Sequence, residues 1–225
     1  MDTVTPQVVF TIWGIPITNT VTSTWIIIAI MIFFAWLLSR KKPIALEMIV
    51  DFITDLLGST MGLDATPYVP FIGTFFLFIA GANILGLVPW VENPTKDLNT
   101  TAALAITVFF SVYYFGIRSR GLSGYLKSLT KPIFILLPFE LIGHFTRALS
   151  LTLRLFGNVI SIELIVAIIF SLIPYFLPSV MALYGAATGL IQAYIFTILA
   201  ATYIGAGVAT TDEMVKKKKL SAAPE

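Results

Sequence analysis

The chain has 225 residues, of which 57% are hydrophobic and only 12% are charged, and its formal net charge is +2. Soluble domains carry about 25% charged residues, so the composition favours a protein embedded in lipid, and no basic surplus suits nucleic-acid binding. The chain has no cysteine and a single histidine. This excludes disulfides, thiolate sites and histidine-cluster metal sites, and we expect neither a metal nor another cofactor.

The N-terminal part of the chain predicts one membrane span and one surface helix. Residues 1–20 lack the basic start and the cleavage site of a signal peptide, and we expect them to form an extracytoplasmic segment. Residues 21–39 are long and apolar enough for a first span. In residues 44–62 acidic side chains recur at every fourth position opposite an apolar face. This pattern predicts an amphipathic helix on the membrane surface or on a partner protein, with a plain solvated helix as the alternative.

Four further apolar segments follow. Residues 70–90 and 100–117 predict two ordinary spans. The last two segments, 132–172 and 178–211, are too long, because about forty helical residues reach about 60 Å, roughly twice the ~30 Å hydrocarbon core. They are either broken or strongly tilted, and a tilted pair of long helices is the better physical interpretation. We therefore predict a single membrane domain over residues 1–225. It is an all-α integral membrane protein with about five membrane helices and one interfacial amphipathic helix.

The basic residues lie on one side of these predicted spans. Eleven of the fourteen Lys and Arg residues follow the first, third and fifth spans, and only Lys96 falls in a loop on the opposite side. The positive-inside rule then predicts an extracytoplasmic N-terminus and a cytoplasmic tail over residues 212–225.

A row of polar and charged residues runs through the fourth apolar segment. Their spacings of four, three, seven and four residues place them along one helical stripe, and they are Glu140, His144, Arg147, Arg154 and Asn158. A charge inside the bilayer costs roughly 2.5–3.5 kcal/mol or more, so these groups must face protein, water or each other. Glu140 could pair with His144 or Arg147, and Arg147 could instead face the headgroups. Arg154 has no acidic residue three or four positions away, so its partner must come from another helix or another chain.

Two more polar residues stand apart from this row. Glu163 follows Arg154 by nine residues, which is half a turn out of phase and ~13 Å along a helix axis. Polar groups on opposite faces and at different depths suit two separate aqueous paths better than one binding pocket. Gln192 would come level with Arg154 if the last two helices pack antiparallel, or it forms only an interhelical hydrogen bond.

Several stretches resemble a known family. Residues 151–158 (LTLRLFGN), followed by Glu163, resemble the signature of subunit a of bacterial F-type ATP synthases. Residues 192–196 (QAYIF) and 83–89 (NILGLVP) resemble further stretches of that family. The similarity extends over nearly the whole chain. It implies that the two long segments form a steeply tilted hairpin wrapped around a rotating ring of c subunits.

The resemblance also implies roles and partners. The family's ion-translocating roles would carry over to Arg154, Glu163, Asn158, Gln192, His144 and Glu140. Of these, Arg154 would face the ring carboxylates and Glu163 would line an aqueous half-channel. The chain would be a non-catalytic subunit of a bacterial inner membrane complex. Its partners would be the c-ring, the peripheral-stalk b subunits and, indirectly, the F1 sector. It has no ATP-binding motif of its own.

The alternative function is a stand-alone secondary ion transporter or channel. Such proteins usually show inverted repeats and paired broken helices, and the sequence has no such internal symmetry. A membrane-embedded enzyme would need a nucleophile–base pair or a metal constellation, and one histidine with two buried glutamates makes a poor case. A purely structural subunit has no reason to place an unpaired arginine at depth. The sequence does not distinguish H⁺ from Na⁺ as the coupling ion.

Overall fold

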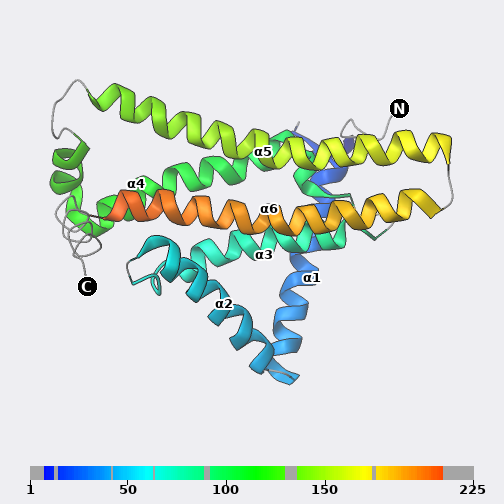
Figure 1. The fold of residues 1–225 in the computed structure, drawn as a ribbon, viewed down its shortest axis with the longest axis horizontal. Coiled ribbons are helices and arrows are strands. Elements are labelled where there is room, and N and C mark those ends of the chain that lie inside the picture. Colours follow the sequence, from blue (N-terminus) through cyan, green and yellow to red (C-terminus); the bar gives the residue numbers. More distant parts are fainter. Residues whose placement is uncertain are drawn as a thin grey trace, which may run out of the picture.

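The computed structural model describes residues 8–12, 15–41, 43–62, 64–88, 92–129, 136–173 and 176–209. Within these ranges the chain forms six α-helices, a short 3-10 helix and an antiparallel β-hairpin (Figure 1). The elements are β1 (Val8–Ile12), β2 (Ile15–Thr18), α1 (Asn19–Lys41), α2 (Pro43–Met61), α3 (Val69–Leu85), η1 (Pro94–Lys96), α4 (Leu98–Leu129), α5 (Leu136–Leu172) and α6 (Phe176–Val208).

Four helices in the described ranges, α1, α4, α5 and α6, are long and apolar enough to cross a membrane. The prediction of a helical, multi-pass membrane protein is therefore confirmed. The helix at the predicted second span is shorter than expected, because α3 has 17 residues and ends at Leu85, which gives it about 26 Å at 1.5 Å per residue. The number of five spans thus stays a prediction. The all-α prediction also did not include the hairpin of β1 and β2.

Helix α6 lies at the centre of the bundle. Half of its apolar window is buried, against 11% for α5, and it packs against α2, α3, α4 and α5. Small side chains on α6 let the neighbouring backbones approach closely. The core residues that it contributes are Ala193, Phe196, Ala200, Ala201 and Ile204, and they pack with Ile53, Leu57, Ile72, Phe75, Ile79, Val108, Val112, Leu151 and Leu155 from the other four helices.

Helices α5 and α6 form a long antiparallel hairpin (Figure 1). The 37 residues of α5 and the 33 residues of α6 correspond to about 55 and 50 Å at 1.5 Å per residue. Pro138 and Pro178 lie in the first turns, where a missing N–H is tolerated, so neither helix is broken. The broken-helix alternative is therefore wrong. In Figure 1, α1 runs across the common direction of α3, α4, α5 and α6.

Helix α2 has one face in the core and one outside. Ile53 and Leu57 are 2% and 0% exposed, whereas Glu47, Asp51 and Asp55 are exposed. A fully solvated helix would not bury such side chains, so α2 is amphipathic and packs on the bundle. Its position on a membrane surface stays a prediction.

Only the N-terminal part of α4 is apolar enough to cross a membrane. Gly121 interrupts the helix with φ 71 and ψ 160, a conformation that glycine adopts at little cost because it has no Cβ. The apolar portion covers Leu98–Ser119. The segment after Gly121 is helical as far as Leu129.

We expect Gly189→Ala to destabilise the bundle. A methyl group at this buried position of α6 would overlap the side chain of Asn83 on α3, and overpacking of this kind costs about 1–3 kcal/mol. The measurement is the thermal unfolding midpoint of the purified chain in detergent. Gly58→Ala on α2 is the matched control, since no atom lies within 4 Å of its added methyl group. Equal midpoints for the two variants would contradict the close packing of α3 on α6.

Candidate functional site

A cavity of ≈ 570 Å³ lies between α3, η1, α5 and α6. Most of its lining is apolar and comes from the facing sides of α5 and α6. The polar and charged lining residues are Asn83, Glu92, Asn93, Lys96 and Glu163. A mainly apolar chamber with a few converging polar groups is the usual character of a binding or transport site.

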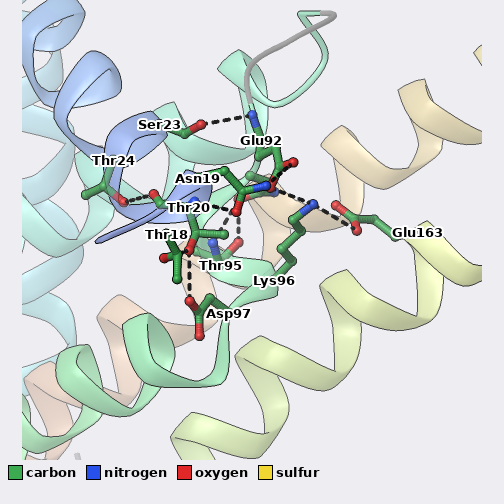
Figure 2. Close-up of polar contacts among 11 residues, drawn as sticks. Thr18, Asn19, Thr20, Ser23, Thr24, Glu92, Thr95, Lys96, Asp97 and Glu163 are labelled. Atoms are coloured by element: carbon green, nitrogen blue, oxygen red, sulfur yellow. Dashed lines mark hydrogen bonds and ion pairs between the residues drawn. The ribbon is translucent and has the colours of Figure 1, made fainter. Parts of the chain in front are cut away.

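Three of these residues form a chain of alternating charge. The Lys96 ammonium lies 3.0 Å from a Glu92 oxygen and 3.8 Å from a Glu163 oxygen. Figure 2 shows Lys96 extending from η1 toward Glu163 on α5. The Lys96 side chain is 11% exposed, and the Glu163 side chain is 33% exposed. Glu163 thus faces the chamber with a cation beside it.

The N-terminal turns of α1 hold in place the loop of residues 92–97, which contains η1 (Figure 2). Asn19 Nδ2 donates a hydrogen bond of 2.6 Å to Glu92 Oε1, and the Glu92 backbone N–H donates to Ser23 Oγ at 3.3 Å. The buried Thr20 hydroxyl donates to Asp97 Oδ2 at 2.9 Å. Residues more than 60 positions apart in the sequence are therefore joined around the chamber.

Asn83 joins the loop to the bundle. Asn93 Nδ2 donates to Asn83 Oδ1 at 3.0 Å, and Asn83 Nδ2 donates to the Ile79 carbonyl oxygen at 2.8 Å. Asn83 is 5% exposed, so its polar atoms need these partners. Gly185 of α6 also lines the chamber, and a methyl group there would collide with Ile162 of α5. The small residue keeps the two long helices close at this end of the chamber.

Arg154 lies on the open side of α5. Its side chain is exposed, and among the described residues no carboxylate forms an ion pair with it. Large apolar residues are also exposed along the length of α5, namely Phe139, Ile142, Phe145, Leu149, Leu153, Leu164, Ile165, Ile168, Phe170 and Leu172. Burial of this charge in lipid without a partner would be costly.

Gln192 lies near the level of Arg154 in the hairpin. Ile162 of α5 is adjacent to Gly185 of α6, and eight residues back along α5 and seven residues on along α6 lead to Arg154 and Gln192. Gln192 is 5% exposed, and its Nε2 has no hydrogen-bond partner among the described residues. The hydrogen bond between helices, which was the alternative role, is thus not formed from this atom. Asn158, one turn from Arg154, is half-buried.

The remaining residues of the row lie toward the start of α5. The His144 ring is 5.6 Å from the Tyr113 ring of α4, and the Arg147 guanidinium lies 5.3 Å from the centre of the Tyr203 ring of α6. His144, Arg147 and Tyr203 line a small void of ≈ 10 Å³, which is about the space that one water needs. The side chain of Glu140 lies outside the described residues, and so does its suggested pairing with His144 or Arg147.

The structure therefore separates the predicted residues into three places. Glu163 lies at the chamber, Arg154 on the open face of α5, and His144 and Arg147 near the void. Sequence reasoning missed Lys96 as a member of the site. Its one signal was that it is the single basic residue in a loop on the predicted outer side. The described part of the chain holds no group of three His, Asp or Glu side chains suited to a metal ion.

Comparison with known proteins gives one consistent result. The family model described as ATP synthase A chain matches residues 21–205. The chain is 40% identical over 218 residues to ATP synthase subunit a 1 of Crocosphaera subtropica, covering 92% of this chain and 95% of that protein. It is 44% identical over 214 residues to ATP synthase subunit a 2 of Picosynechococcus sp., covering 91% of each. It is also 39% identical over 211 residues to ATP synthase subunit a of Moorella thermoacetica, covering 91% and 97%.

Proposed function

The chain belongs to the ATP synthase A chain family, and we propose that it is the ion-translocating stator subunit a of a bacterial Fo sector. It provides two aqueous half-channels that load and unload H⁺ or Na⁺ on the carboxylates of a c-ring, so that ion flow is coupled to rotation and ATP synthesis. It carries out no catalysis on nucleotides, which falls to the F1 sector.

The observation that carries this proposal is the position of Arg154. A guanidinium stays protonated under all conditions in which proteins work, so Arg154 cannot relay a proton. It can attract a carboxylate of another chain across the apolar face of α5. A nearby cation favours the ionised form of a carboxyl group. A ring carboxylate that reaches Arg154 therefore releases its ion before it passes.

The chamber at Glu163 supports a separate path on the outer side. Glu163 points from α5 toward Lys96 of η1, and it lies nine residues along α5 from Arg154, which is about 13 Å at 1.5 Å per residue. An ion that enters here reaches a carboxylate first and the ring afterwards. The ring carboxylate takes up this ion before it returns to lipid, where an ionised carboxylate would be costly. Arg154 lies between the two paths, and its charge repels a cation that would leak directly from one to the other.

The remaining assignments follow the family. Asn158 and Gln192 line the ring interface beside Arg154, and His144 and Glu140 belong to the channel-lining set. The peripheral-stalk b subunits are further partners, and the complex lies in the bacterial inner membrane with the N-terminus of this chain outside and its C-terminus in the cytoplasm.

The arrangement of the helices supports the proposed tilt. If α1 crosses the bilayer along its own axis, the long α5–α6 hairpin that it crosses (Figure 1) must be steeply inclined. The length of about 55 Å for α5 agrees with such an inclination, because an upright helix would extend far beyond the ~30 Å core. The unbroken course of both helices gives no support to a stand-alone transporter, which typically binds its ion at broken helices.

We expect Arg154→Ala to abolish ion-driven ATP synthesis. The ring carboxylate loses the cation that favours its ionised form, and the two paths lose the charge that separates them. The measurement is ATP synthesis in vesicles energised by an imposed ion gradient, with assembly checked on a native gel. Arg147→Ala is the matched control, because Arg147 is also an arginine of α5 but packs on Tyr203. Measurable synthesis in assembled Arg154→Ala would defeat the proposal.

Glu163→Gln should slow ion flux through the complex and leave its assembly intact. The amide keeps the size of the side chain but cannot bind the entering cation as a carboxylate does. Flux is measured as passive ion movement through the membrane sector after F1 has been removed. Glu47→Gln, at an exposed position of α2, controls for the loss of one carboxylate. Wild-type flux in assembled Glu163→Gln would remove Glu163 from the path.

A further inference from the structure

We propose that Lys96 determines the cation affinity of the outer path. Its ammonium group lies beside the Glu163 carboxylate, which an entering ion must reach, and therefore acts as a built-in competing cation. This inference rests on the proposed function of the Glu163 chamber. It adds a residue that the sequence pattern did not assign, and it states what that residue does to the transported ion.

The position of the ammonium group is fixed from several sides. Lys96 contacts Glu92 at 3.0 Å and Glu163 at 3.8 Å, and Asn19 holds Glu92 through a hydrogen bond of 2.6 Å. The Asn93 side chain caps η1 by accepting from the Thr95 backbone N–H at 3.1 Å. With its side chain only 11% exposed, Lys96 stays at the chamber and does not extend into solvent.

The net charge of the chamber lining would be neutralised by one further monovalent cation. Its charged lining residues are Glu92, Lys96 and Glu163, with a net charge of −1. Helix α3 contributes the neutral Asn83, and α6 contributes Ala182, Gly185 and Ala186. An entering cation therefore competes with Lys96 for the Glu163 carboxylate.

The apolar walls make this competition strong. Charges a few ångström apart interact much more strongly in apolar surroundings than in water, and Val159, Ile162 and Val166 line the chamber. Repulsion by Lys96 lowers the occupancy of Glu163 and hastens departure of the bound cation toward the ring. The Lys96 ammonium thus lowers the affinity of Glu163 for the transported cation and increases the rate at which that cation is released.

The test measures half-saturation separately from the maximal rate. Purified whole complex is reconstituted in vesicles, and ATP synthesis is driven by a fixed membrane potential. Two probes vary on the outer side, protons in sodium-free buffer and NaCl at constant pH, and the probe that saturates the wild-type complex is used for the variants. Lys96→Met should lower the half-saturating cation activity by about tenfold, the lower end of what a neighbouring charge does to a carboxylate. Lys96→Arg should stay within about twofold of wild type, because the positive charge is kept.

Two further variants test the proposed role of Lys96, one by a change in the opposite direction and one as a control. Glu92→Gln leaves the ammonium with Glu163 as its remaining carboxylate in the chamber, so the half-saturating activity should rise. Arg118→Met, at an exposed position of α4, removes a positive charge elsewhere and should leave the half-saturating activity unchanged.

An unchanged half-saturating activity in Lys96→Met or in Glu92→Gln would overturn the inference, whatever happens to the maximal rate. Lys96 would then only brace the loop. Wild-type flux in Glu163→Gln would instead contradict the outer path itself. The two failures are therefore distinguishable.

Discussion

A permanent cation on an apolar, exposed helix face is the constraint on which the whole arrangement depends. Arg154 cannot lose its proton, and burial of its charge in lipid would cost several kcal/mol. No carboxylate within the described residues pairs with it. We therefore propose that a carboxylate of another chain supplies the partner of Arg154 on this face of α5. A subunit with this property is suited to work against a moving partner, since each passing carboxylate satisfies the same charge in turn.

The core around α6 keeps this face apart from the chamber. Arg154 and Glu163 point in different directions because nine residues separate them on α5, and close packing of α6 against α2, α3, α4 and α5 holds α5 in place. The same packing brings Asn83 and η1 to the chamber wall. Stability of the fold and separation of the two proposed paths thus depend on the same small-residue contacts along α6.

The sequence predicted the elements better than their contacts. Apolar length was enough to predict the long helices, because it depends on residues close together in the chain. The partner of Arg154 was left open between another helix and another chain, because a partner distant in sequence leaves no local pattern. The broken-helix alternative placed possible breaks at Pro138 and Pro174. Pro138 lies in the first turn of α5, where proline is tolerated, α5 runs on unbroken to Leu172, and Pro174 lies outside the described residues. The β-hairpin and the Asn19–Glu92–Lys96 network could not be predicted, since Asn19 and Glu92 are 73 residues apart and no local period links them.

Cysteine cross-linking tests most directly whether Arg154 faces the ring. This chain has no native cysteine, so each introduced cysteine is the only one in it. Ser150 and Ser161 are exposed on the helical stripe of Arg154, and Thr74 is exposed on α3. Each is replaced by cysteine in the assembled complex and paired with a cysteine next to the membrane carboxylate of the ring subunit. We expect disulfides to the ring from Ser150→Cys and Ser161→Cys and none from Thr74→Cys. Cross-links from Thr74→Cys alone would show that the ring lies elsewhere and that Arg154 does not face it.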